Sequence, residues 1–342
     1  MSGSRIWTEL DFDAEGKHSG YLHLPHSVND SAYGTIAIPI AVIRNGKGPT
    51  VLIMGGIHGD EYEAQIVICR LMRELAPDHL RGTVILIPAV NLPAAMAGTR
   101  VSPLDDLNMN RCFPGDPNGR PTEQLAHYVD SVLLPRCDVW LDWHSGGWSL
   151  DYMPFASIHR FRDAALTETN LRALAAFGGP VGVVWSFFDE PRMAKGCAER
   201  HGLVYLGSEF GGGGSVNRAG VALAYDGTLR VLKHLGVLAP TAPFAITPPQ
   251  ATRYFDIAGR NHNIYAPHPG LFEPCCGLGE AVRAGALVGL IHYVDDPLRP
   301  PATVHARTDG TVLCLRHPGR TRRGDCIVQL GTEIPTQAGT TA

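Results

Sequence analysis

The sequence has no long apolar stretch, no basic stripe and no leader-like start, and each absence excludes a class of protein. No run of about 18 apolar residues occurs, so a transmembrane helix is not expected. Positive and negative residues are interspersed at a formal net charge of −4, which argues against nucleic-acid binding. The segment MSGSRIWTELDFDAEG lacks the basic and apolar regions of a signal peptide. We therefore expect a cytoplasmic protein that binds neither membranes nor nucleic acid.

Paired cysteine motifs are also missing. Eight cysteines are scattered through 342 residues and none forms a CxxC pair, so reduced thiols are expected rather than a disulfide framework. A chain of this length, with 44% hydrophobic residues, can bury a full core in one large domain or a domain with a smaller partner. Its 39 glycines and 26 prolines predict many loops, which suits an enzyme whose site is built from loops.

Apolar segments alternate between strand-like and helix-like patterns, which predicts an α/β sheet covered by helices. Strands are expected at 35–45, 50–56, 83–90, 138–144, 182–187 and 203–210, and helices at 60–75, 122–136, 163–177 and 217–238. A Pro-rich stretch, 239–250, precedes short apolar runs broken by Gly and Pro. The sequence thus predicts a catalytic domain over 1–245, with an N-terminal β segment at 1–45, and a β-rich C-terminal domain over 246–342.

Two histidines and a glutamate follow the ends of predicted strands. His58 and Glu61 lie in GGIHGDEYE, where a strand gives way to a helix, and His144 lies in DWHSGG after another strand. Sites in open α/β sheets gather at the carboxyl ends of strands. Three such ligands leave a fourth position for water, which is the pattern of a catalytic zinc site.

The alternative for each of these side chains is a structural role, since a lone His before Gly is commonly a hydrogen-bonded loop residue. The pairing of two strand ends flanked by glycines favours the metal site, because glycines let ligand loops approach an ion closely. Asp142 lies two residues before His144, so on an extended strand it points the same way and could orient that imidazole. A solvated or capping role for Asp142 stays open.

Four motifs together resemble the succinylglutamate desuccinylase/aspartoacylase family of the zinc carboxypeptidase-like clan: GGIHGDE, NMNRCFPG, DWHSGG and SEFGGGG. The resemblance covers roughly residues 50–330. It implies a zinc-carboxypeptidase-like mixed sheet flanked by helices, with a smaller barrel-sandwich-like β domain after it. Within the family, LNMNRCFPG and YAPHPGLFEP are most similar to the N-α-acetyl-L-2,4-diaminobutyrate deacetylases of ectoine degradation.

The resemblance implies roles for four further residues. Glu209, in SEFGG, matches the general base that takes a proton from water and passes it to the leaving amine. Asn110 and Arg111 match the pair that grips the substrate carboxylate, and Arg100 matches the arginine that steadies the oxyanion. The alternative for both arginines is a surface ion pair. Asn108 stands where relatives such as aspartoacylase have an acid, so the resemblance assigns it no role.

The expected activity is therefore zinc-dependent deacetylation of N-α-acetyl-L-2,4-diaminobutyrate by an enzyme with one zinc per subunit. Other N-acyl amino acid deacylases, of the succinylglutamate or acetylaspartate type, and metallocarboxypeptidases remain alternatives, because they share the Asn-Arg pair. Asp189 and Glu190 are candidates to meet the substrate's side-chain ammonium. Relatives often pair, so a homodimer is expected.

The C-terminal segments resemble the barrel-sandwich fold of biotinyl and lipoyl carriers, which would be a different class of function. Such carriers need a lysine at a hairpin tip, and no lysine follows Lys233. A carrier is therefore excluded, and a purely metal-binding protein is disfavoured by Glu209. In the family that it resembles, such a tail shapes the mouth of the active site.

Overall fold

The computed structural model describes residues 3–187 and 191–335. The helices are α1 (Tyr62–Glu74), α2 (Leu92–Ala97), α3 (Pro121–Tyr128), α4 (Ala164–Phe177), α5 (Ala194–His201) and α6 (Arg218–His234). The strands up to the middle of the chain are β1 (Gly16–Pro25), β2 (Thr35–Asn45), β3 (Thr50–Met54), β4 (Gly82–Ile87), β5 (Val139–Asp142), β6 (Leu150–Tyr152), β7 (Phe155–His159), β8 (Val181–Trp185) and β9 (Val204–Glu209). The later strands are β10 (Arg253–Ile257), β11 (Asn263–Tyr265), β12 (Gly270–Pro274), β13 (Ala281–Val282), β14 (Leu287–His292), β15 (Ala302–His305), β16 (Gly310–Arg316), β17 (Arg320–Thr321) and β18 (Cys326–Ile334).

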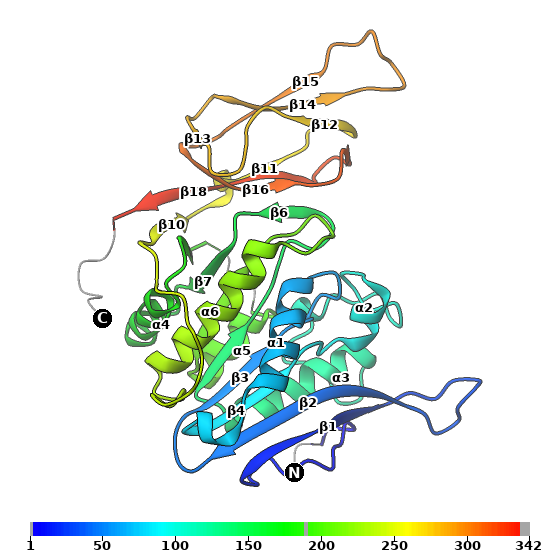
Figure 1. Ribbon diagram of the computed structural model, residues 1–342. Coiled ribbons are helices and arrows are strands. Elements are labelled where there is room, and N and C mark those ends of the chain that lie inside the picture. Colours follow the sequence, from blue (N-terminus) through cyan, green and yellow to red (C-terminus); the bar gives the residue numbers. More distant parts are fainter. Residues whose placement is uncertain (1–2, 188–190, 336–342) are drawn as a thin grey trace.

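A mixed sheet runs through the molecule in the order β1-β2-β4-β3-β5-β9-β7-β8-β10-β18-β16-β13. Its centre is parallel: β3 pairs with β4 and β5, and β5 pairs with β9. β7 runs antiparallel to β9, and the β1–β2 hairpin projects from one end (Figure 1). The carboxyl ends of β3, β5 and β9 therefore meet at one edge of the parallel core, where the candidate site lies.

Helices cover both faces of this sheet, because the central strands are apolar on both sides. Val51 and Ile53 of β3 pack in one cluster with α1, α4 and α6, whereas Leu52 and Met54 pack in another with α3 and α5. Each cluster is made almost entirely of side chains that exclude solvent. This two-sided core holds the strand ends rigidly and so fixes the positions of the residues that follow them.

The C-terminal part of the chain is rich in strands and has its own apolar cluster, and it lies against one end of the α/β part (Figure 1). Hydrogen bonds tie the two parts together: β10 pairs with β8 and with β18, and β16 pairs with β6. In the described residues, no helix is both long and apolar enough to cross a membrane. All eight cysteines are free thiols.

The predicted α/β class with a β-rich tail is confirmed, and the predicted strands match β2, β3, β4, β5, β8 and β9 closely. The predicted helix at 122–136 is wrong in its second half. α3 ends at Tyr128, and a π-helical turn (Val129–Leu133) and a 3-10 turn (Leu134–Arg136) follow. Pro135 lies in that last turn and has no backbone N–H to donate, which is incompatible with a regular helix. β7 and α5 were not predicted.

Candidate metal centre and active site

The loop from β3 to α1 places His58 and Glu61. It passes so close to α2 that a Cβ at Gly59 would lie 1.9 Å from the backbone carbon of Ala94, so only glycine fits there. Glu61 is the N-cap residue of α1, and its side chain turns away from the helix end toward His58. Both side chains are buried, with 2% of each residue exposed. The tight loop thus directs an imidazole and a carboxylate to one point.

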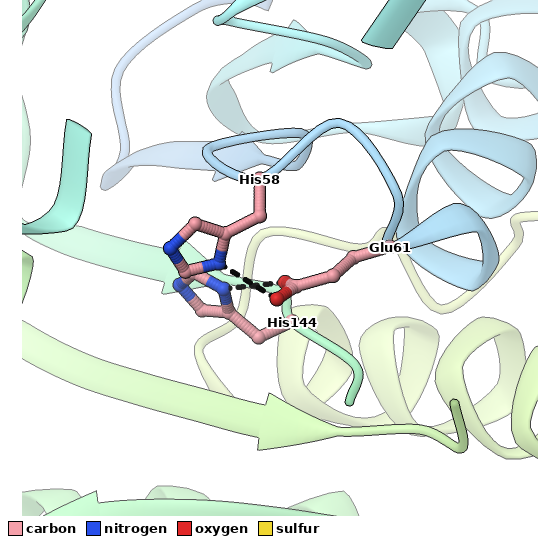
Figure 2. Close-up of side chains that lie close together, drawn as sticks. All are labelled: His58, Glu61 and His144. Atoms are coloured by element: carbon pink, nitrogen blue, oxygen red, sulfur yellow. Dashed lines mark hydrogen bonds and ion pairs between the residues drawn. The ribbon is translucent and has the colours of Figure 1, made fainter. Parts of the chain in front are cut away.

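His144 reaches the same point from the end of β5. Its backbone N–H donates to Ser208 Oγ at 2.8 Å, and Ser208 Oγ donates back to the His144 carbonyl at 3.0 Å, which fixes the strand end to β9. His58 Nδ1 and His144 Nδ1 each lie 2.7 Å from an oxygen of Glu61 (Figure 2). One ligand atom from each of the three residues lies within 4.8 Å of the others. The structure therefore brings the three predicted ligands together.

The outer nitrogen of each imidazole is held by a hydrogen bond. His58 Nε2 lies 3.0 Å from Asn108 Oδ1, and His144 Nε2 lies 3.1 Å from Asp142 Oδ2. The backbone N–H of Asn110 donates to the same Asn108 oxygen, which identifies it as an acceptor. Both imidazoles therefore carry a proton on Nε2, which leaves Nδ1, the nitrogen beside Glu61, as the atom that would bind a metal ion. Asp142 makes the predicted contact with His144. The contact of Asn108 with His58 was not indicated by the sequence.

The electrostatics of the cluster favour a carboxylate anion among imidazoles. Burial raises the pKa of Glu61, but the charges and hydrogen bonds of His58 and His144 outweigh it and hold that pKa well below its ordinary value. Burial lowers the pKa of His144, whereas Asp142 and Glu61 raise it well above the usual range. At His58, burial is the largest influence and its pKa is lowered. A buried anion of this kind is stabilised by positive charge and by hydrogen-bond donors at the same point.

Glu209 ends β9 and lines the same cavity as the three clustered residues. Its Oε2 is buried and has no hydrogen-bond partner. Burial, followed by repulsion from the carboxylate of Glu61, raises its pKa from 4.5 to about 8. An acid with a pKa near neutral can both accept and return a proton under physiological conditions, as general acid–base catalysis requires.

The remaining predicted residues line this cavity too. Asn110 Oδ1 accepts from the backbone N–H of Ala194 at 2.8 Å, which leaves the amide NH₂ of Asn110 available to a ligand. Arg111 Nη1 donates to the Asn110 carbonyl at 2.6 Å. Arg100, with 45% of its side chain exposed, places Nη1 3.3 Å from Glu61 Oε1. Asp189 and Glu190 lie outside the described residues.

The cavity has a volume of about 360 Å³ and is lined by more residues than the sequence indicated. β7 and β8 supply Ser157, His159 and Trp185, and the β-rich tail supplies Asn263, Tyr265, Cys326 and Gln329. None of these lies in one of the four motifs, so the motifs did not indicate them. The strand-end pattern could have indicated His159 and Trp185, each of which is the last residue of its strand.

Comparison with known proteins agrees with this fold. The succinylglutamate desuccinylase/aspartoacylase catalytic-domain family matches residues 47–235, and the chain belongs to that family. It is 36% identical to the N-alpha-acetyl-L-2,4-diaminobutyric acid deacetylase of Halomonas elongata, over 97% of this chain and 96% of that one. The predicted family membership is therefore confirmed.

Solved structures of relatives match nearly the whole chain. A succinylglutamate desuccinylase/aspartoacylase from Rhodobacter sphaeroides is 44% identical, with a TM-score of 0.90, over 97% of this chain and 100% of that one. The product-bound ectoine utilization protein EutE (DoeB) from Ruegeria pomeroyi is 36% identical, with a TM-score of 0.92, over 96% of this chain and 99% of that one. The β-rich tail is thus part of the fold that these relatives share.

Proposed function

We propose that this protein is a zinc-dependent amidohydrolase that deacetylates N-α-acetyl-L-2,4-diaminobutyrate to acetate and 2,4-diaminobutyrate. The observation that carries the proposal is the convergence of His58 Nδ1, His144 Nδ1 and Glu61 in the cavity that Glu209 also lines. Two imidazoles and a carboxylate are the ligand set of a catalytic zinc site, in which a position remains for water or substrate.

The cluster fits zinc on the chemistry of its donors. Both Nδ1 atoms lie beside the Glu61 carboxylate, and Asn108 and Asp142 hold the opposite nitrogens, so the three ligands are already oriented toward one point. When bound there, zinc supplies Lewis-acid polarisation of a carbonyl group and acidifies water. His58, Glu61 and His144 would hold it, with one ion per subunit.

Glu209 is proposed as the general base and acid. Its pKa of about 8 in the folded chain, raised mainly by burial, gives it a proton affinity that suits transfer in both directions near neutral pH. It takes the proton from the attacking water at its carboxylate and delivers that proton to the nitrogen of the departing amine. The unpartnered Oε2 supports this assignment, because no hydrogen bond within the protein competes for it.

Arginines and an amide are proposed to hold the substrate's negative charges. Arg111, with the free NH₂ of Asn110 beside it, binds the α-carboxylate, since a guanidinium matches a planar carboxylate with two hydrogen bonds. Arg100, whose Nη1 lies 3.3 Å from Glu61 Oε1, donates to the oxygen that becomes negative when water adds to the acetyl carbonyl. Both positive charges are in place before substrate arrives, which is what preorganised stabilisation requires.

The choice of acyl group and amino acid is supported by the relatives. One at 36% identity is a diaminobutyric acid deacetylase, and another is an ectoine utilization protein, each matching almost the entire chain. We therefore place the protein in ectoine degradation.

We also propose the division into a catalytic part, 1–245, and a β-rich part, 246–342, which contributes one wall of the cavity. A homodimer and a cytoplasmic location stay predictions.

The test is a substrate panel on the zinc-loaded protein. N-α-acetyl- and N-γ-acetyl-diaminobutyrate, N-acetylaspartate, succinylglutamate and a set of dipeptides are compared by chromatographic detection of the released amine. The proposal expects N-α-acetyl-diaminobutyrate to give the highest kcat/KM. Dominant cleavage of dipeptides would instead make the protein a metallocarboxypeptidase, and dominant release of succinate or aspartate would move it to another branch of the family.

A further inference from the structure

Glu63 is a buried carboxylate that the proposed chemistry does not use. It lies in the first turn of α1, two residues after Glu61, and only 1% of the residue is exposed. Burial raises its pKa, and the charge of Glu61 acts in the same direction, while hydrogen bonds to Ser145 and Asn217 only partly oppose these effects. A carboxylate buried in this way reduces the stability of the folded protein. Its effect on the site therefore has to come from the contacts that it makes.

The two oxygens of Glu63 hold two loops, which follow the ends of β5 and β9. The hydroxyl of Ser145 donates to Oε2 at 2.6 Å, and the backbone N–H of Asn217 donates to Oε1 at 2.7 Å. Ser145 directly follows His144, and Asn217 is the N-cap residue of α6, after the glycine-rich loop that begins beyond Glu209. One carboxylate on α1 therefore ties together loops that adjoin a proposed metal ligand and the proposed general base.

Ser145 connects Glu63 to the metal cluster. Its hydroxyl donates to Glu63, and its backbone N–H donates to Glu61 Oε2 at 3.2 Å. The same Glu61 oxygen lies 2.7 Å from His144 Nδ1. Glu63 thus fixes a residue that both holds the Glu61 carboxylate and follows His144 in the chain. Without the hydroxyl contact, the backbone N–H of Ser145 would be free to shift, and the Glu61 carboxylate would lose a fixed donor.

The two loops also contact each other beside Glu63. The backbone N–H of Gly146 donates to the Gly211 carbonyl at 2.8 Å. A Cβ at Gly211 would lie 2.6 Å from Asn217 Cβ and 3.1 Å from Glu63 Oε1, so a side chain there would displace the contact between Glu63 and Asn217. Because the loops are packed this closely, a shift of one of them moves the other.

We infer that Glu63 is a positioning residue for the metal centre: through the hydroxyl of Ser145 it fixes the Glu61 carboxylate, and through Asn217 it holds the loop that follows Glu209. Among the described residues, Glu63 is not one of those that line the cavity, so it acts through these two contacts. The inference rests on the proposed function, because it takes Glu61 to be a zinc ligand and Glu209 to be the base.

The test compares the wild type with Glu63→Met and Glu63→Gln. Methionine has a similar length but is a weak acceptor, whereas glutamine can accept from the Asn217 N–H and donate its amide to the Ser145 hydroxyl. We expect Glu63→Met to weaken zinc binding about 10- to 100-fold in a chelator competition, as the loss of a group that orients a metal ligand does. Glu63→Gln should bind zinc nearly as tightly as the wild type.

Turnover gives a second readout. In zinc-saturated Glu63→Met, kcat for N-α-acetyl-diaminobutyrate should fall about 10- to 100-fold, because the proposed base and ligands are displaced. KM should change little, since Asn110 and Arg111, which are proposed to bind the substrate, lie on a different loop. A control is Thr167→Ala, which removes a buried hydroxyl on α4 that does not line the cavity. It should lower stability without changing zinc affinity or kcat.

A milder variant keeps the test decisive if Glu63→Met does not fold. Ser145→Ala removes only the hydroxyl and should also weaken zinc binding. In the Glu63→Met background it should have no further effect, because both changes break the same hydrogen bond. Independent losses that add in the double variant would contradict the inference.

Wild-type zinc affinity in Glu63→Met or in Ser145→Ala would overturn the inference and leave the deacetylase standing. Equal losses in Glu63→Gln and Glu63→Met would overturn it too, because glutamine preserves both contacts. A wild type that binds zinc but cleaves no acylated amino acid would remove the proposed function, and the zinc affinities of the variants would still decide the inference. A wild type that binds no zinc would overturn both.

Discussion

Replacing the carboxyl of Glu209 by an amide should stabilise the metal-free protein at alkaline pH. In the folded chain the pKa of Glu209 is about 8, raised from 4.5 chiefly by burial and then by Glu61. Below pH 4.5 the carboxyl is protonated in both folded and unfolded chains and has no effect. Between pH 4.5 and about pH 8 the folded chain binds more protons at Glu209 than the unfolded chain does. The free energy of unfolding therefore falls as the pH rises through about 8. Glu209→Gln removes this loss.

The size of the effect follows from the same shift. One pKa unit corresponds to about 1.4 kcal/mol, so a carboxyl moved from 4.5 to about 8 destabilises the ionised folded state by at most about 5 kcal/mol. The Glu209 residue is partly exposed although its Oε2 is buried, and solvent therefore reduces the expected difference to about 2–4 kcal/mol. The folded protein is less stable by this free energy when the buried Glu209 carboxyl is ionised.

The assay is urea denaturation of chelator-treated wild type and Glu209→Gln between pH 5 and 9.5. The unfolding free energy of the variant minus that of the wild type should rise with pH and level off above about pH 9. Glu168→Gln, which makes the same chemical change on the exposed part of α4, is the control. A difference for Glu209→Gln that is flat or falls with pH would refute the reasoning.

Three further predictions follow from the site. Glu209→Gln should retain one zinc per chain by atomic emission while losing about 10³-fold or more in kcat; unchanged turnover would show that another group is the base. Arg111→Lys should raise KM for N-α-acetyl-diaminobutyrate more than it lowers kcat, because a lysine cannot replace a two-point grip on the carboxylate; an unchanged KM would remove Arg111 from substrate binding. Asn108→Leu should weaken zinc binding about 10- to 100-fold in a chelator competition, because His58 loses the acceptor for its Nε2–H; wild-type affinity would mean that this hydrogen bond does not orient the ligand.

The parallel core and the metal cluster were predictable because their patterns are local. Apolar strands followed by glycine-rich turns indicate where strands end, and topology brings those ends together, so His58 and His144 could be paired from sequence. The close approach of Gly59 to Ala94 explains why that turn is conformationally restricted. The general-base position needed the family resemblance, because one strand-end glutamate has no distinctive spacing.

Two elements, α5 and β7, could not be predicted because contacts with the rest of the fold, rather than a local sequence pattern, stabilise them. α5 has few apolar residues and a glycine inside it, and that Gly196 is required because a Cβ would lie 2.5 Å from the Pro191 carbonyl oxygen. β7 is short, and its register with β9 arises from pairing that crosses the chain order. Gln329 could not be predicted as a cavity residue either, because its strand, β18, lies far along the chain from the metal cluster.

The central claim is that His58, Glu61 and His144 hold one zinc ion. The most direct measurement is the zinc content of purified wild type, His58→Ala, Glu61→Ala and His144→Ala, with His127→Ala as a control imidazole on α3 outside the cavity lining. The account predicts one zinc per chain in the wild type and the control, and almost none in the three ligand variants. Full zinc occupancy in His58→Ala or His144→Ala, with the fold intact by circular dichroism, would contradict it.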